Sequence, residues 1–115
     1  MYTFEILLQD RSALAIFCGR NQGSDLDYGE SLDVTLKAFT GSYSAILFIV
    51  PEFIKEKILE LLSINDRLVS NISRYGSNTS VNFYSFNEYG FLDRFTTLGK
   101  AGDEYEADTK LRDLV

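Results

Sequence analysis

The sequence contains no histidine, and this absence excludes more chemistry than any other feature of the chain. A Ser-His-Asp or Cys-His nucleophile, a histidine-ligated zinc ion and an imidazole pH switch all need a histidine side chain. The single cysteine likewise excludes a disulfide within the chain and a metal cluster held by several thiolates. We therefore expect no metal and no cofactor, and we predict a protein that is not an enzyme.

Basic residues are also scarce. The chain has 11 Lys and Arg against 17 Asp and Glu, which gives a formal net charge of −6 at pH 7. Nucleic-acid backbones and anionic membranes are bound through clustered Lys and Arg, so we expect neither as a partner. A basic protein surface fits this charge, although many proteins carry a mild negative charge only to stay soluble.

No long apolar run is present. The longest, Ala45–Pro51, is far shorter than the ~20 residues that span a bilayer. The first residues lack the basic start of a secretory signal, and Glu5 interrupts the apolar stretch that follows, so we expect a cytoplasmic protein. The chain has 115 residues and no repeat, linker or low-complexity segment, which predicts a single domain over residues 1–115.

Apolar residues that alternate with polar ones, or that form short β-branched and aromatic stretches, predict strands. Leu7 breaks the alternation in the stretch Tyr2–Gln9. In the stretch Ser31–Phe39, Leu32, Val34 and Leu36 alternate regularly with polar residues. Glycines and acids between Gly19 and Glu30 predict a loop. The expected strands are Tyr2–Gln9, Ala13–Cys18, Ser31–Phe39, Tyr43–Val50, Thr79–Phe86 and Phe91–Leu98.

At Pro51 the spacing of the apolar residues changes from every second residue, as in a strand, to about every 3.6 residues, as in a helix. Proline suits the first turn of a helix, and the apolar residues from Ile54 to Ile72 recur with helical spacing. Residues 63–66 resemble a capping box, which predicts a break there, and Gly76 ends the second helical piece. A short C-terminal helix over residues 103–115 is the last expected element, with a frayed tail as the alternative.

Together these elements predict an α+β fold. We expect a mainly antiparallel sheet of about six strands, with one or two central helices packed on one face.

Two segments combine carboxylates with a tyrosine and are the candidate partner-binding sites. Tyrosine provides contact area at a low entropic cost, and carboxylates pair with Lys and Arg on a partner. A solvated loop and an acidic first helical turn, both without function, are the alternative. The candidate residues are Asp25, Asp27, Tyr28 and Glu30 in the first cluster, and Asp103, Glu104, Tyr105, Glu106 and Asp108 in the second.

Aromatic residues crowd into the last predicted hairpin, residues 79–98. They serve either as core under a helix or as a hydrophobic docking surface. The residues are Phe83, Tyr84, Phe86, Tyr89, Phe91 and Phe95.

These features favour a small acidic protein-binding module that occludes a basic partner, such as a nuclease toxin or another nucleic-acid-handling protein. In size, charge and lack of catalytic residues the chain is similar to immunity proteins and to phage-encoded inhibitors, although no motif identifies either family. One alternative is a structural subunit that forms a homo-oligomer through the aromatic hairpin. Another is a small enzyme or ligand-binding domain that uses carboxylates and tyrosines in a cleft.

Overall fold

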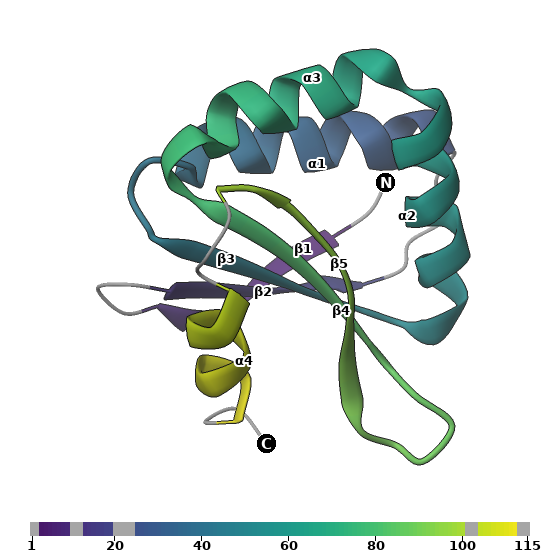
Figure 1. Cartoon of the computed structure of the whole chain (residues 1–115). Coiled ribbons are helices and arrows are strands. Elements are labelled where there is room, and N and C mark those ends of the chain that lie inside the picture. The colour runs from purple at the N-terminus through teal and green to yellow at the C-terminus, as the bar shows by residue number, and fades with distance from the viewer. Residues whose placement is uncertain (1–2, 10–12, 20–24, 101–103, 113–115) are drawn as a thin grey trace.

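The computed structural model describes residues 3–9, 13–19, 25–100 and 104–112 (Figure 1). One sheet with the strand order β1-β2-β3-β4-β5 is packed against helices, so the predicted α+β class is confirmed. In chain order the elements are β1 Thr3–Gln9, β2 Ala13–Gly19, α1 Asp25–Phe39, β3 Ala45–Val50, α2 Glu52–Ile64, α3 Asp66–Tyr75, the 3₁₀ turn η1 Gly76–Asn78, β4 Ser80–Phe86, β5 Leu92–Gly99 and α4 Glu104–Arg112.

The sheet is mixed rather than mainly antiparallel. Strands β2, β3 and β4 run parallel to one another, whereas β1 and β5 each form an antiparallel hairpin at one edge. Parallel neighbours need a crossover connection, which α1 provides between β2 and β3, and α2 with α3 between β3 and β4. The described sheet has five strands, and the pairings of β1 with β2 and of β4 with β5 are antiparallel, so the prediction of about six mainly antiparallel strands is matched only roughly.

Helix α1 replaces the predicted strand Ser31–Phe39 and the end of the predicted loop. Leu32 and Leu36 are buried, whereas Val34 between them is 67% exposed. A strand would place these three side chains on one face, but a helix buries residues three or four apart. The loop prediction over residues 19–30 is therefore wrong from Asp25 onward.

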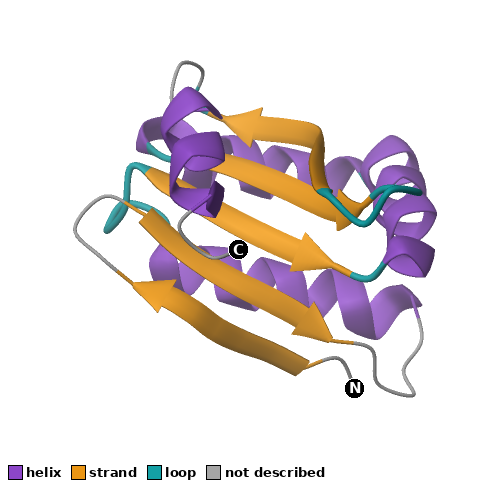
Figure 2. Ribbon diagram, turned by 90° about the horizontal axis from the view of Figure 1, so that it is seen from below, coloured by secondary structure: helices purple, strands orange, loops and turns teal. Residues whose placement is uncertain are grey.

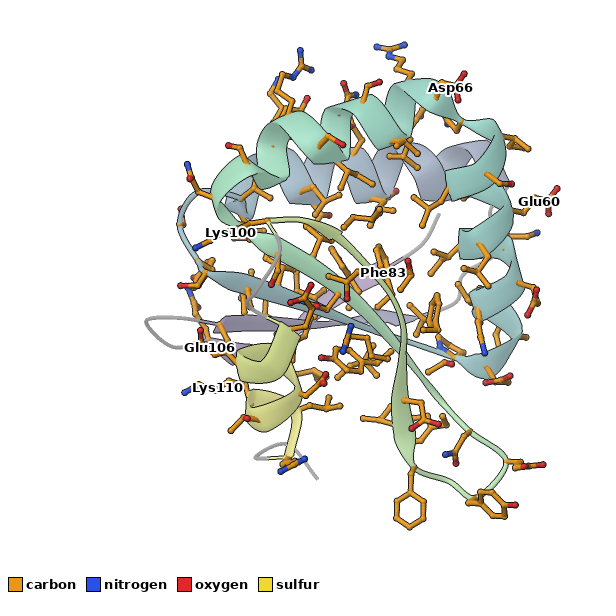
Figure 3. The ribbon with its side chains drawn as sticks, in the orientation of Figure 1. Glu60, Asp66, Phe83, Lys100, Glu106 and Lys110 are labelled. Atoms are coloured by element: carbon orange, nitrogen blue, oxygen red, sulfur yellow. The ribbon has the colours of Figure 1, made fainter. Side chains whose placement is uncertain are left out.

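Helices cover both faces of the sheet, but unequally. Helices α1, α2 and α3 pack on one face, and α4 alone packs on the other (Figures 1 and 2). The larger core lies on the three-helix side, where Phe83 points from the sheet toward the helices (Figure 3). The smaller core lies under α4, where Ala107 and Leu111 pack with Leu47, Ile49 and Tyr84.

The break between α2 and α3 lies within the predicted segment. Asn65 separates the helices, and its side-chain oxygen accepts a hydrogen bond of 3.0 Å from the backbone N–H of Leu68. Such a bond satisfies one of the free N–H groups in the first turn of a helix. The cap of α3 is thus Asn65, whereas the Ser63 hydroxyl donates back to the carbonyl of Glu60.

Both edge strands contain a β-bulge. In β1, Ile6 pairs with Ile16 and Leu8 with Ala15, so Leu7 is the extra residue, which explains its irregular place in the sequence pattern. In β5 the extra residue is Phe95, because the register shifts by one at the step from Phe83 to Tyr84 on β4. Bulges twist an edge strand and hinder its pairing with another sheet.

Candidate functional site

The loop that ends the β4–β5 hairpin is held in one shape by Asn87. Its side-chain oxygen accepts hydrogen bonds from the backbone N–H of Tyr89 at 2.9 Å and of Phe91 at 3.0 Å. Its amide nitrogen donates to Asp93 at 2.8 Å, and its backbone N–H donates to the Phe91 carbonyl. Because these bonds already order the loop, a partner that contacts it loses little further entropy.

Three aromatic side chains at this end of the hairpin face solvent, and we call them the aromatic tip. Phe86 is 44% exposed, Tyr89 76% and Phe91 69%. The end of the hairpin extends beyond the helices and the rest of the sheet (Figure 1). Phe83 and Tyr84 are buried, so the aromatic hairpin divides into core and exposed parts. Neighbouring exposed aromatic residues are typical of interaction surfaces.

The outward side of α2 combines acids with apolar side chains. Glu52, Glu56 and Glu60 follow one another at four-residue spacing and are all exposed. Glu60 points away from the body of the molecule (Figure 3). Between them lies Phe53, which is 59% exposed. This side of α2 therefore offers negative charge and an aromatic ring together.

The aromatic tip and the start of α2 lie at the same end of the sheet. Val50, the last residue of β3, pairs with Ser85 on β4, and Phe86 is the next residue along β4. Helix α2 begins at Glu52, so both features follow directly from the carboxyl ends of adjacent strands (Figure 1). A single partner can contact both.

The two predicted acidic clusters do not form one surface. Residues 25–30 begin α1 on the three-helix face, whereas residues 104–108 lie in α4 on the opposite face (Figure 2). Glu30 is exposed, and Glu104, Glu106 and Asp108 are half-buried. Asp103 and the side chains of Asp25, Asp27, Tyr28 and Tyr105 lie outside the described residues.

Asp108 is engaged inside the molecule. It accepts a hydrogen bond of 2.7 Å from the Tyr84 hydroxyl, and its Oδ1 lies 3.1 Å from Arg94 Nε. Burial, strengthened by the bond to Asp108, holds the pKa of the Tyr84 hydroxyl well above its usual range. The separate hydrogen bond that Arg94 donates to Asp108 raises the pKa of Arg94. These contacts tie α4 to β4 and β5.

The network continues into the sheet through Thr97. Arg94 donates to the Thr97 hydroxyl at 2.8 Å, and that hydroxyl donates to Asn82 at 3.0 Å. Asn82 is fully buried and donates to the Ile46 carbonyl at 3.2 Å. Arg94 is thereby held by Asp108 of α4 and by Thr97 of β5. This connected network favours a structural role for Arg94 and its partners.

Comparison of the chain with protein-family models, curated proteins and solved structures gives no match. None of the helices in the described ranges is long and apolar enough to cross a bilayer. In the same ranges no three side chains of the metal-ligating types come together. Functional assignment therefore depends on the surfaces and contacts of the chain itself.

The acidic side of α2 is absent from the sequence-based candidates. Its signal is present in the sequence as glutamates four residues apart from Glu52 to Glu60, with Phe53 among them. That spacing shows that the three acids share a side of the helix. It does not show that this side adjoins the aromatic tip, because only the parallel pairing of β3 and β4 brings them together.

Proposed function

We propose that this protein is a small acidic protein-binding module whose aromatic tip anchors it on a basic surface of a partner protein. The exposure of Phe86 at the end of β4, and of Tyr89 and Phe91 in the pre-ordered loop that follows, is the observation that carries this proposal. Large aromatic side chains that can be buried against a partner supply most of the binding energy in many interfaces. The loop holds them in place before the partner arrives.

Carboxylates around the tip supply the charge that a basic partner recognises. We define the docking face as the aromatic tip together with Glu52, Phe53 and Glu56 of α2. The net charge of −6 includes the acids at the start of α1 and on α4, which strengthen the long-range field without contacting the same partner surface. Binding therefore blocks a surface on which the partner, such as a nuclease or another nucleic-acid-handling protein, grips phosphates.

The proposal includes no catalytic step. Tyr84 and Asp108 are titratable residues that line a cleft, and the Tyr84 hydroxyl donates a hydrogen bond to Asp108, which is also paired with Arg94. A tyrosine whose pKa is raised by burial keeps its proton at neutral pH and is a poor proton donor or acceptor there. This arrangement suits the attachment of α4 better than it suits proton transfer.

Comparative affinity capture tests the proposal. The native chain, the double variant Tyr89→Ala/Phe91→Ala and the control Val34→Ala are immobilised and exposed to a lysate of the source cells. Val34 is 67% exposed on α1, so its substitution removes exposed apolar surface away from the tip. We expect a basic protein that binds the native chain and the control but not the double variant. Retention of the same proteins by the double variant, or capture of no basic protein by the native chain, contradicts the proposal.

A second candidate is self-association through the aromatic tip, because the same exposed rings are able to bury one another in a homo-oligomer. Light scattering after size-exclusion chromatography separates the two functions. A stable oligomer of the native chain that persists at high salt and dissociates in Tyr89→Ala/Phe91→Ala supports self-association. A monomer at all salt concentrations excludes it.

A further inference from the structure

An open cleft of about 920 Å³ lies beside β5, between α2 and α4. Its lining includes Lys55 and Leu59 of α2, Arg94 and Phe95 of β5, and Arg112 of α4. None of these five residues belongs to the docking face. The cleft is therefore a separate feature, joined to the aromatic tip only through Phe91.

The bulge in β5 shapes this cleft. Arg94 pairs with Tyr84, whose ring lies in the core under α4. The next residue, Phe95, is the extra residue of the bulge, and its ring centre lies 6.1 Å from that of Phe83 on the three-helix side. At this point the edge strand directs a cation to one side of the sheet and an aromatic ring to the other.

The cleft is cationic although the whole chain is acidic. Lys55, Arg94 and Arg112 line it, against Asp93 and Asp108. Both acids are engaged, since Asp108 accepts from Arg94 and Tyr84 while Asp93 accepts from the side chain of Asn87. Asp108 is paired with Arg94, but Asp93 keeps its negative charge because Asn87 is neutral. The lining therefore carries an excess of one positive charge, to which Lys55 and Arg112 contribute.

Neither of these two side chains forms an ion pair with another of the described residues. The contact of Lys55 among them is with the face of the Phe95 ring, 5.7 Å from Nζ to the ring centre, and no carboxylate of those residues forms an ion pair with Arg112. Arg112 is exposed in the last turn of α4.

Apolar side chains lie beside these cations. Phe95 and Leu59 are half-buried, and Phe91 is 69% exposed at the end of the cleft toward the tip. The lining thus combines charged side chains with aromatic and aliphatic ones, and sites for small organic molecules pair apolar surface with polar groups that fix the orientation of the ligand. The rings cover the organic body of a ligand, and the cations fix its charged end.

We infer that this cleft binds a small amphipathic anion, an organic carboxylate or sulfonate with an aromatic or branched aliphatic body. Lys55, which lies over the Phe95 ring, holds the anionic group, and the body packs against Phe91 and Phe95. Arg112 adds positive charge from α4, on the other side of β5. An inorganic anion is a poorer match, because it needs several converging donors and Arg94 is already held by Asp108 and Thr97.

Two fluorescent probes with the same ring system test this inference. 8-Anilinonaphthalene-1-sulfonate carries a negative charge, and N-phenyl-1-naphthylamine lacks it. The variants are Lys55→Gln and Arg112→Gln, and the control is Lys37→Gln, which removes one exposed positive charge from the last turn of α1. We expect Lys55→Gln to weaken binding of the sulfonate roughly three- to tenfold, as for a partly exposed charge pair, and Arg112→Gln to weaken it less. Both variants leave binding of the neutral probe within about twofold. The control leaves the binding of both probes unchanged.

The position of the probe is measured independently. The chain contains no tryptophan, so Phe91→Trp introduces a single donor whose emission overlaps the absorption of the sulfonate probe. We expect strong energy transfer from position 91 and weak transfer from Val34→Trp on α1. The inference is overturned if the sulfonate does not bind the native chain, if neither cleft variant weakens its binding, if Lys37→Gln weakens it equally, or if transfer from position 34 equals that from position 91.

Discussion

Close backbone contact at the end of β5 leaves no room for a side chain at position 99. Gly99 has a φ of +77°, and a Cβ there would lie 2.4 Å from the carbonyl oxygen of Thr79 and 2.8 Å from that of Gly76. Both neighbours are backbone atoms, so neither can move without shifting the strand. Gly99 therefore meets two requirements at once, a left-handed conformation and a close approach.

Substitution of Gly99 by alanine separates these requirements when it is compared with Gly90→Ala. Gly90 has a similar φ of +82°, but nothing lies within 4 Å of its Cβ position. We expect Gly90→Ala to lower the free energy of unfolding by about 1 kcal/mol, from conformation alone. Gly99→Ala lowers it by about 3 kcal/mol or more, because backbone must also move. Equal losses of unfolding free energy in the two variants, measured by urea unfolding, would contradict the close backbone contact at Gly99.

The Tyr84 hydroxyl links β4 to α4, so Tyr84→Phe tests how α4 is attached. The variant loses the bond to Asp108, which keeps its ion pair with Arg94, and we expect a loss of about 1–2 kcal/mol in the free energy of unfolding at pH 7. Tyr75→Phe controls for the loss of a hydroxyl from a half-buried ring on the three-helix side. A loss no larger than that of the control would mean that this bond does not stabilise α4.

The raised pKa of Tyr84 also predicts a loss of stability at high pH. The unfolded chain releases the Tyr84 proton near the ordinary tyrosine pKa of about 10, whereas the folded chain keeps it to higher pH. Above pH ~10 the unfolded state therefore binds fewer protons, and the free energy of unfolding falls as the pH rises. Below that pH the contribution of Tyr84 is complete. We expect Tyr84→Phe to show a shallower fall than the native chain between about pH 10 and 11, and an identical slope would be the contrary result.

Among the elements, α1 shows where local sequence signals fail. Val34 and Thr35 are β-branched, and Gly29 resembles a helix breaker, so each local preference disfavours a helix. Gly29 is instead buried inside α1, with its Cβ position 4.0 Å from the side chain of Asn65. Contacts between distant segments thus override these weak preferences, and no short window of sequence contains those contacts.

The periodicity of α1 is tested by two alanine substitutions two residues apart. Leu36 is fully buried and Val34 is 67% exposed, so we expect Leu36→Ala to lower the free energy of unfolding by about 2–5 kcal/mol. Val34→Ala changes it by less than about 0.5 kcal/mol, because alanine also has the higher helix propensity. Comparable losses in thermal or urea unfolding would support a strand in which both residues face the core.

The strands and the paired helices were easier to predict than the direction of the strands. Apolar runs identify β1 to β5, and the 3.6-residue period from Ile54 to Ile72 identifies α2 and α3. The direction of β3 depends on whether the segment before it is a strand or a crossover helix. Once α1 is known to be a helix, it can serve as the crossover that parallel pairing of β2 and β3 requires, and the structure shows that pairing.

For the whole molecule, the candidate surface was predicted only in part. The aromatic hairpin stands out in the sequence, but the division between the buried Phe83 and the exposed Phe91 depends on how far the hairpin extends beyond the helices. Periodicity shows which side of a helix is apolar, but not which face of the sheet that helix covers. For this reason the sequence does not show that the clusters around Glu30 and Glu106 lie on opposite faces.

Two groups of residues in the docking face are expected to control different rates of partner binding. Aromatic anchors that become buried control mainly the dissociation rate, whereas carboxylates at the rim control mainly the association rate and its dependence on salt. Glu52→Gln/Glu56→Gln therefore slows association with a basic partner at low salt. Tyr89→Ala/Phe91→Ala speeds dissociation and leaves the salt dependence of association unchanged.

The most direct test of the proposed function is the dissociation rate of the captured basic partner from the native chain and from Tyr89→Ala/Phe91→Ala, measured by surface plasmon resonance. We predict that the double variant dissociates at least roughly 30-fold faster, which corresponds to the loss of an interface anchor worth about 2 kcal/mol. A partner that dissociates from the double variant at the native rate would contradict the assignment of the aromatic tip as the anchor.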